Sequence, residues 1–547
     1  MSDDGSYDFS AAPSPDELAR FEASDLGNAM RLILIAGGKV RPDGEVDATG
    51  SRLLFVLGRG WIGYDGQRFD FKYGDDLARR MAHKVAHQTR ALYDQWVPDK
   101  MDAKAFFKFA DGCGSAGATS AMLRQAQSYL TVDIEVFDRD PLALNCRNGT
   151  VRMRWSEAKG FSARLEPHDP KHRITRITAA AFDPKAPAPR FLQVVEDSLP
   201  DLAWRDYLHR CLGYCATGLV SEQAFFVCQG RGRDGKSTIL DACREALGDY
   251  GEVGDVASFL ENRNANSGGP SPDLVKLSGD VRLCVLSEPP RGTALAEGRL
   301  KAWTSGSPIT ARDLNSKNFN FRPIAKLVWE MNAWSPVKDD SDGIWRRIHP
   351  VLFERQVPID KLDRDLPNHI RSHELAGVIA WLVRGVEAWI TPVEKDGRRS
   401  RGLRPPKRAE QAVSNYRRET SPFGDWLAER CVTHGSDGDG KPERTLAKEL
   451  FADFKAWMEE QGHEKVMSIR AFGDALRARQ IDVMGKNSAG LKYRGPIRLK
   501  TPAELSADQA AAEAALAAMN DLSSAGGHVA GPDLGGAADE IEEDPFS

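Results

Sequence analysis

Residues 223–242 read QAFFVCQGRGRDGKSTILDA, and this stretch decides the fold of the middle of the chain. The apolar run from Ala224 to Cys228 predicts a strand, and the run from Ser237 to Leu247 has the apolar spacing of an amphipathic helix. The loop between them satisfies the pattern G-x-x-x-x-G-K-[ST] with Gly230, Gly235, Lys236 and Ser237. A glycine-rich turn with a chance lysine is the alternative. Because a strand precedes the loop and a helix follows it, the sequence predicts a P-loop that holds nucleotide phosphates.

The residue types in this loop suit a nucleoside triphosphate bound with a divalent cation. Glycines let backbone N–H groups approach the phosphates, and the helix N-terminus adds the positive end of its dipole. Lys236 is expected to neutralise the β- and γ-phosphates, and the Ser237 hydroxyl to complete a Mg²⁺ shell. The predicted cofactors are therefore ATP and Mg²⁺. The predicted nucleotide-binding residues are Gly230, Gly232, Asp234, Gly235, Lys236, Ser237 and Thr238.

A second acidic element is expected at the end of a neighbouring strand. The apolar run from Val281 to Leu286 predicts such a strand, and it delivers Glu288. Motor ATPases often carry two adjacent acids at this place, whereas here the first of the two is Ser287. Glu288 is predicted to polarise the attacking water or to hold the metal together with Ser237.

Two further segments supply candidate catalytic groups. The apolar stretch KLVWEM predicts a strand that ends at Asn332, whose amide could orient the lytic water. An asparagine used as a turn residue is the open alternative. The segment IWRRI carries Arg346 and Arg347, and an arginine suits a finger that stabilises the transferring phosphate. A surface salt bridge is the alternative for this pair.

Composition indicates a globular protein of several domains. The chain has 547 residues, of which 41% are hydrophobic and 28% charged. No apolar run reaches the roughly 18 residues of a membrane span, and the acidic N-terminus does not resemble a secretory signal. We therefore expect a protein of the cytoplasm. The eight cysteines are scattered and are expected to be reduced, with Cys211 and Cys215 on a buried helix face rather than in a metal site.

Charge is distributed unevenly along the chain. The net charge is −5, but residues 501–547 hold ten acidic and no basic side chains, so residues 1–500 carry +5. Residues 1–20 hold five acids and one base, which leaves residues 21–500 at +9. A basic body with acidic ends favours a polyanionic partner such as DNA.

The order of these motifs resembles the superfamily 3 helicases, specifically the phage and plasmid primase–helicase family that includes the poxvirus primase–helicase. The matching stretches are DLGNAMRL (25–32), GWIGYDGQRF (60–69), LNCRNGTVRM (144–153), YLHRCLGYCATG (207–218), GRGRDGKST (230–238), RLCVLSE (282–288), LKAWTSGSPITARDLNSKNFNFRP (300–323), LVWEMNAWSP (327–336) and IWRRI (344–348). The sequence departs from the family at Asp234, where Asn is usual, and at Ser307, where Asp is usual.

The resemblance implies a fold class, α/β, with an AAA+-like P-loop ATPase core. It also implies a mixed α+β accessory domain before this core and a winged-helix domain after it. The expected segments are a disordered N-terminus (1–20), the accessory domain (21–205), the ATPase domain (206–392), a basic linker (393–410), the winged helix (411–500) and a disordered acidic tail (501–547).

The resemblance also implies an ATP-driven ring, usually a hexamer, that moves 3′→5′ on single-stranded DNA. Such a ring places ATP between subunits, so Arg346 or Arg347 would be the arginine finger that acts on the ATP of the neighbouring subunit. Family members carry a β-hairpin in the pore, and the strands TARDL and NFNFRP fit this hairpin, with Lys317 at its tip and Arg312 beside it. An ordinary exposed hairpin lysine is the alternative. A cation on such a loop can track phosphates without reading bases.

The last module is expected to contact DNA or another protein. Residues 420–500 predict three helices and a wing-like hairpin, with Arg477, Lys492 and Arg494 as candidate phosphate contacts. Many winged helices bind protein, so both readings stay open. The acidic C-terminal segment, ADEIEEDPFS, resembles tails that dock on replication proteins, and an inert tail is the alternative.

The leading hypothesis is an ATP-dependent DNA helicase of phage or plasmid replication, in a bacterial cytoplasm, acting on single-stranded and forked DNA. A primase–helicase is the second hypothesis. Neither a zinc ribbon nor an acidic primase motif is evident, so we expect a primase on a separate polypeptide. The third hypothesis is an origin-binding initiator or scaffold whose ATPase only controls assembly.

Overall fold

The computed structural model describes the chain from residue 13 to residue 508 with short gaps. The described ranges are 13–92, 103–261, 271–312, 318–337, 342–358, 362–395, 398–420, 422–433, 435–436, 440–462 and 466–508. The chain forms two compact units, Met1–Arg417 and Arg418–Ser547. None of the helices within these ranges is long and apolar enough to cross a membrane.

The first unit is built around a parallel sheet of five strands in the order β11-β12-β15-β10-β16. The strands are β10 (Phe225–Gly230), β11 (Gly251–Gly254), β12 (Leu283–Leu286), β15 (Lys326–Met331) and β16 (Ile348–Phe353). The four strands other than the edge strand β11 are mostly buried apolar runs, as expected when helices cover both faces of a parallel sheet. The predicted α/β class with a P-loop type of sheet is therefore confirmed for this part of the chain.

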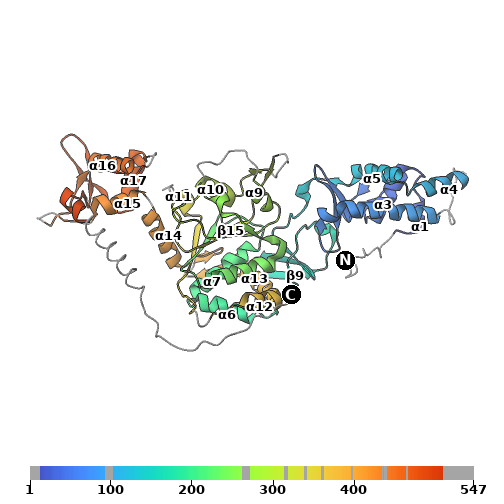
Figure 1. The fold of residues 1–547 in the computed structure, drawn as a ribbon, viewed down its shortest axis with the longest axis horizontal. Coiled ribbons are helices and arrows are strands. Elements are labelled where there is room, and N and C mark those ends of the chain that lie inside the picture. Colours follow the sequence, from blue (N-terminus) through green and yellow to red (C-terminus); the bar gives the residue numbers. More distant parts are fainter. Residues whose placement is uncertain are drawn as a thin grey trace, which may run out of the picture. The chain divides into compact units, whose positions relative to one another are not determined.

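Helices cover both faces of this sheet. On one face lie α7 (Leu202–Cys215), α8 (Lys236–Leu247) and α13 (Leu375–Ile390), which share one hydrophobic core with β10 and β16. On the other face lie α9 (Pro272–Lys276), α10 (Glu297–Thr304) and α11 (Asp342–Trp345), in a second core. Figure 1 shows α7 and α13 on the opposite side of β15 from α9 and α10.

Helices α7 and α13 approach each other through two glycines. A Cβ atom at Gly213 would lie 2.1 Å from the backbone carbon of Gly385, so no larger residue fits there. Cys211 and Cys215 are buried on α7, and all eight cysteines are buried and unpaired, as predicted. Among the described residues no group of three His, Cys, Asp or Glu side chains could hold a metal ion by itself.

The N-terminal part of the first unit combines helices with a four-stranded sheet, a three-stranded sheet and a separate two-stranded pair. The helices are α1 (Pro15–Ala19), α2 (Asp25–Ile35), α3 (Gly74–Ala91), α4 (Ala103–Gly112) and α5 (Ala116–Leu130). The four-stranded sheet contains β3 (Leu53–Val56), β4 (Gly60–Tyr64), β5 (Phe69–Asp70) and β6 (Thr131–Val132), and β1 (Lys39–Val40) pairs with β2 (Val46–Asp47). The second sheet contains β7 (Ala143–Cys146), β8 (Gly149–Ser156) and β9 (Gly160–Glu166).

The beginning of the chain differs in part from the expected disorder of residues 1–20. Residues 1–12 lie outside the described ranges, but Pro15–Ala19 form α1. Ser14 caps this helix because its hydroxyl accepts the Glu17 N–H while the Glu17 carboxylate accepts the Ser14 N–H. Leu18 is buried in the same core as α2 and α3, which anchors the short helix. The acidic tail beyond residue 508 lies outside the described residues.

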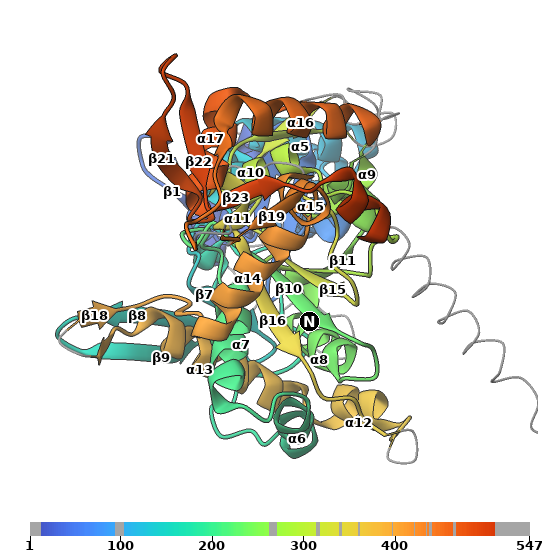
Figure 2. The same cartoon turned by 90° about the vertical axis from the view of Figure 1, so that its left-hand side faces the viewer.

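Smaller elements complete the first unit. They are α6 (Pro189–Ser198), β13 (Ile309–Ala311), β14 (Phe319–Phe321), α12 (Leu366–His373), β17 (Val393–Lys395), β18 (Arg398–Ser400) and α14 (Lys407–Thr420). The antiparallel pair β13–β14 is the hairpin predicted for the third family motif, although its tip lies outside the described residues. The segment expected as a basic linker holds the β17–β18 hairpin, which lies beside β8 and β9 (Figure 2). There Arg399 binds the Glu157 carboxylate through two hydrogen bonds of 2.6 and 2.8 Å.

The second unit has the predicted order of three helices followed by a strand–turn–strand hairpin. Its elements are α15 (Pro422–Arg430), β19 (Cys431–Thr433), β20 (Thr445–Leu446), α16 (Ala447–Glu460), α17 (Ile469–Ala478), β21 (Asp482–Lys486), β22 (Lys492–Gly495) and β23 (Ile497–Leu499). Phe423, Trp426, Phe454 and Phe472 pack as an aromatic centre. The pairing of β19 with β23 was not predicted, because these strands have three residues each and no alternating pattern.

Candidate nucleotide site

The P-loop runs from the end of β10 into the first turn of α8. Gly232 and Gly235 adopt φ values of +82° and +83°, a backbone region that glycine enters without steric cost. Gly235 also has no room for a side chain, since a Cβ atom there would lie 2.0 Å from Ser198 Oγ. The loop therefore needs glycine at position 235 for both its conformation and its packing.

The loop borders a cavity of about 380 Å³ at the carboxyl ends of β10, β12 and β15. Ligands of open α/β sheets bind at this edge, outside the carboxyl ends of the strands. The predicted residues that line the cavity are Gly232, Asp234, Gly235, Lys236, Ser237, Thr238, Glu288 and Asn332. Gly230 lies at the end of β10 beneath the loop, where a Cβ atom would lie 2.1 Å from Asp234 Oδ2.

Asp234 and Lys236 form a buried ion pair in the loop. Lys236 Nζ lies 2.6 Å from Asp234 Oδ2, and the two residues are only 4% and 2% exposed. The same carboxylate accepts the Gly232 N–H at 3.1 Å and the Lys236 N–H at 3.4 Å. The Asp234 carboxylate thus uses the donors that a P-loop offers to a phosphate.

Asn332 forms hydrogen bonds with both Lys236 and Glu288. Its amide nitrogen donates to Glu288 Oε2 at 2.6 Å, and its amide oxygen accepts a hydrogen bond from Lys236 Nζ at 3.3 Å. Both Glu288 and Asn332 are exposed to the cavity. The three side chains come from α8, from the residues after β12 and from the end of β15, so only the parallel sheet brings them together.

Glu330 is a site residue that the sequence analysis missed. It lies in β15, lines the cavity and accepts a hydrogen bond of 2.5 Å from the Ser237 hydroxyl. Burial raises the pKa of Glu330 above its ordinary value, and the hydrogen bond from Ser237 opposes this shift. The signal was a carboxylate within the otherwise apolar run LVWEM (327–331), two residues before Asn332.

The register between β12 and β15 places Glu330 next to Ser287. Leu286 in β12 pairs with Trp329 in β15, so the next residues along the two parallel strands are Ser287 and Glu330. Glu330 therefore supplies a carboxylate beside Ser287, the position at which motor ATPases often carry the first of two acids. Besides Asp234 of the loop, the site thus holds the carboxylates of Glu288 and Glu330, which come from neighbouring strands.

The paired arginines lie away from this cavity. Both precede β16, at the edge of the sheet opposite to the P-loop. Arg347 is 7% exposed, and its guanidinium donates to Thr304 Oγ1 at 3.0 Å, to Gln223 Oε1 at 3.3 Å and to the Gly343 carbonyl oxygen. Arg346 is exposed and makes one long contact of 3.4 Å with Gln223. Of the two arginines, Arg346 is therefore the exposed one and Arg347 the buried one.

The predicted DNA contacts differ in exposure. Lys317 lies outside the described residues, and the backbone of Arg312, the residue after β13, is hydrogen bonded to Ser271. In the second unit, Lys492 is exposed, and Arg477 is exposed beside Asp474. Arg494 is only 8% exposed, because its side chain lies beneath α17 next to Gly473. The described fold therefore does not present Arg494 to a phosphate.

Comparisons with known proteins support a family relationship. Residues 46–200 match the family described as "D5 N terminal like". The chain is 27% identical over 266 residues to "Putative helicase L207/L206" of Acanthamoeba polyphaga mimivirus, an alignment that covers 47% of this chain and 27% of that protein. It is 25% identical over 271 residues to "Putative helicase 022R" of Frog virus 3, with coverage of 46% and 27%.

A third relative carries the name of a primase. The chain is 25% identical over 216 residues to "Putative primase C962R" of African swine fever virus, with coverage of 39% of this chain and 22% of that protein. The aligned part spans about a quarter of the length of these relatives. Among solved structures, the apo structure of the NrS-1 C terminal region covers 81% of this chain and 94% of that chain at 10% identity, with a TM-score of 0.41. The resemblance predicted from the motifs is confirmed: the chain has a D5 N-terminal-like segment and is a distant relative of these viral helicase and primase proteins.

Proposed function

We propose that this protein is the ATP-driven motor of a DNA helicase that serves phage or plasmid replication in a bacterial cytoplasm. One observation carries the proposal: Lys236, Ser237, Glu288, Glu330 and Asn332 converge on one cavity at the carboxyl edge of a parallel sheet. The parallel sheet, with the P-loop strand β10 between β15 and β16, supports the AAA+-like core that the resemblance implies. Relatives named as helicases support the same assignment.

The residues of the cavity suit the separate tasks of phosphoryl transfer. The Lys236 ammonium would neutralise charge on the terminal phosphates, and the α8 N-terminus would bind them through backbone N–H groups. The Glu288 carboxylate would accept a proton from the attacking water, and Asn332 would hold that carboxylate in place through the 2.6 Å hydrogen bond. Asp234 has to release Lys236 before the phosphates can bind.

A divalent cation fits the donors of this cavity. The Ser237 hydroxyl and the Glu330 and Glu288 carboxylates are oxygen ligands, which Mg²⁺ prefers, and phosphate oxygens would complete its shell. Bound Mg²⁺ would neutralise charge on the phosphate oxygens.

We further propose a homo-oligomeric ring, most simply a hexamer, with ATP between subunits. Arg346 is the candidate finger because it is exposed, whereas Arg347 is buried in its own subunit and stabilises the segment that carries Arg346. The β13–β14 hairpin would grip single-stranded DNA through Lys317 and Arg312. The second unit would act as a winged helix, with Arg477 and Lys492 facing DNA, and the acidic tail would dock on a separate primase or another replisome protein.

The deciding experiment is ATP-dependent strand displacement on a duplex with a single-stranded tail, with Lys236→Ala as the matched inactive variant. Unwinding by the wild type alone supports the proposal. Hydrolysis stimulated by DNA without unwinding would instead indicate a translocase or loader. Absence of hydrolysis, together with origin-specific binding that survives Lys236→Ala, would favour the initiator or scaffold.

A further inference from the structure

Arg233 stands at a position of the P-loop that the nucleotide-binding pattern leaves open to any residue. In G-x-x-x-x-G-K-[ST] the phosphate contacts come from backbone N–H groups and from the lysine, and the hydroxyl serves the metal. The side chain between Gly232 and Asp234 therefore has no task in the general pattern. In this chain it is an exposed arginine that lines the cavity of about 380 Å³. The cavity thus contains a second cation besides Lys236.

The backbone of Arg233 is held in a conformation that disfavours arginine. Its φ is +53°, in the left-handed region that a residue with a Cβ atom enters only at a free-energy cost. The Val357 N–H donates to the Arg233 carbonyl oxygen at 2.7 Å. The Gln356 side-chain amide donates to the carbonyl oxygens of Gly232 at 2.9 Å and of Arg231 at 3.2 Å. The segment that follows β16 therefore fixes the three residues of the loop before Asp234.

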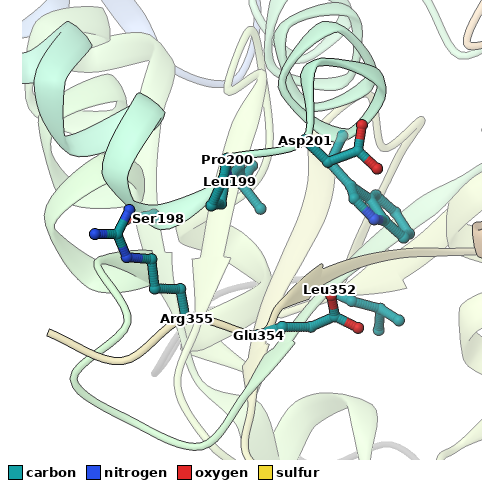
Figure 3. A pocket seen from close by; sticks show the side chains of 8 residues that line it. Ser198, Leu199, Pro200, Asp201, Leu352, Glu354 and Arg355 are labelled. Carbon is teal, nitrogen blue, oxygen red and sulfur yellow. The ribbon is translucent and has the colours of Figure 1, made fainter.

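Two segments outside the loop hold it in place. The segment after β16 begins with Glu354 and Arg355, which Figure 3 shows across a cavity of about 330 Å³ from residues 198–201. Ser198, at the end of α6, packs against Gly235, where a Cβ atom would lie 2.0 Å from the Ser198 hydroxyl oxygen. A left-handed backbone at a residue other than glycine persists only where the surrounding structure fixes it, and such residues are frequent at functional sites.

The charges of the cavity distinguish Arg233 from Lys236. Three carboxylates line the cavity, those of Asp234, Glu288 and Glu330, against two cations. Lys236 is 4% exposed and is paired with Asp234 at 2.6 Å. The Arg233 side chain, in contrast, is exposed and forms no hydrogen bond or ion pair with the part of the chain that the structure describes. An incoming polyanion therefore meets one cation that no carboxylate has neutralised.

We propose that the Arg233 guanidinium binds the phosphates of the nucleotide and supplies the positive charge that Asp234 neutralises at Lys236. The inference rests on the proposed ATPase function and adds a phosphate-binding side chain to it. A guanidinium suits this task because it donates two parallel N–H bonds to phosphate oxygens. Since the contact is to phosphate, loss of Arg233 should weaken the binding of a nucleotide and of inorganic tripolyphosphate by the same factor.

The test measures affinity for both ligands in full-length protein. ADP and tripolyphosphate are titrated calorimetrically in the presence of Mg²⁺. Arg233→Gln is expected to weaken the binding of each about tenfold, and Arg233→Lys, which keeps the charge, should lose less. Arg231→Gln is the matched control, because Arg231 is also an exposed arginine of the loop but is not among the described residues that line the cavity. It should change either affinity by less than about twofold.

Arg233→Gly separates phosphate binding from folding. Glycine enters the left-handed region without the steric cost, so this variant should melt at a temperature no lower than the wild type. It should nevertheless lose tripolyphosphate affinity as Arg233→Gln does. A lower affinity in a protein that is at least as stable supports a direct contact with phosphate.

Three results would overturn the inference. The first is wild-type affinity for tripolyphosphate in both Arg233→Gln and Arg233→Gly. The second is an equal loss in Arg231→Gln, which would indicate a general effect of loop charge. The third is a loss of ADP binding alone, which would place Arg233 at another part of the nucleotide. Failure of the wild type to bind either ligand would instead refute the proposed ATPase itself.

Discussion

Asp234 and Lys236, two residues apart in the P-loop, form a buried ion pair with 2.6 Å between Oδ2 and Nζ. Two backbone N–H groups donate to the same carboxylate. The Asp234 carboxylate thereby accepts hydrogen bonds from N–H groups of the loop that are expected to bind phosphate. A triphosphate must displace this anion and then share the loop with its negative charge. In the family that the motifs resemble, a neutral asparagine is usual at this position, and it would not bring this negative charge into the loop.

Asp234→Asn is expected to tighten nucleotide binding about tenfold, which corresponds to about 1.4 kcal/mol. The amide oxygen can still accept one of the two N–H groups that bind the carboxylate, whereas the amide nitrogen cannot accept the other, and the negative charge next to the phosphates is removed. Calorimetric titration with ADP measures the effect. Asp241→Asn, a change at an exposed carboxylate of α8, is the control and should leave the affinity unchanged. Unchanged or weaker binding by Asp234→Asn would show that the carboxylate does not compete with phosphate.

Lys236→Ala is expected to abolish ATP hydrolysis and also to lower the melting temperature. Removal of the ammonium leaves the buried Asp234 carboxylate without its cation, and breaking a buried pair in this way costs roughly 3 kcal/mol. The double variant with Asp234→Asn should recover the melting temperature but not the hydrolysis. Calorimetry and an ATPase assay separate the two effects. A melting temperature that the second substitution does not restore would argue against the ion pair as the cause.

Glu330→Gln is expected to weaken the binding of a divalent cation in the presence of ADP by about tenfold or more, while ADP binding without metal changes little. The direct readout is Mn²⁺ binding followed by electron paramagnetic resonance. Glu387→Gln, on the exposed side of α13, is the control. Equal Mn²⁺ affinity in Glu330→Gln and the wild type would remove Glu330 from the metal site.

The Mn²⁺ affinity of the wild type is also expected to depend on pH. Burial raises the pKa of Glu330 above the ordinary value of 4.5, so its carboxylate takes up a proton at a higher pH than an exposed glutamate does. Only the ionised carboxylate binds the cation. Mn²⁺ affinity in the wild type should therefore fall as the pH decreases through this raised pKa, and Glu330→Gln should show a flatter profile.

Arg346→Ala is expected to lower ATP hydrolysis, whereas Arg347→Ala is expected to lower the stability of the fold. Arg346 is exposed, so its removal should leave the melting temperature unchanged while hydrolysis by the oligomer falls about 10³-fold. Mixing Arg346→Ala with Lys236→Ala subunits should restore part of the activity, because each supplies the residue that the other lacks. Arg347→Ala should lower the stability by about 2 kcal/mol, since Thr304 and Gln223 lose their buried partner. Full activity of Arg346→Ala would rule it out as the finger.

Lys492→Ala and Arg494→Ala should likewise separate DNA binding from folding in the second unit. Lys492 is exposed, so its loss should reduce the slope of log K against log salt concentration by about one. Arg494 is buried, and its replacement should change the stability of this unit more than that slope. Fluorescence anisotropy with a labelled oligonucleotide across a salt series measures both. An unchanged slope for Lys492→Ala would favour a protein partner for this unit.

Much of the candidate site was predictable because its residues obey local rules. The strand before Gly230 and the helix after Lys236 are fixed by apolar spacing and by the glycines of the loop. Glu288 and Asn332 were found because each follows an apolar strand, and the carboxyl ends of parallel strands meet at one edge of a sheet. The motif order added the family relationship, which the comparisons confirm.

Glu330, the Asp234–Lys236 pair, the roles of Arg346 and Arg347, and the burial of Arg494 were not predictable in this way. Glu330 reaches Ser237 only through the register between β10 and β15, which no local pattern specifies. Arg346 and Arg347 are adjacent, so the local sequence does not distinguish their roles, whereas the structure leaves Arg346 exposed and buries Arg347. The sequence by itself determined the strands and the loop, since these depend on spacing and residue type, and from the same residues it predicted the class of ligand. The tertiary structure alone decided that Lys236 meets Asn332, that Ser237 meets Glu330 and that Arg347 meets Gln223, because these contacts join segments about 90 residues and more apart in the chain.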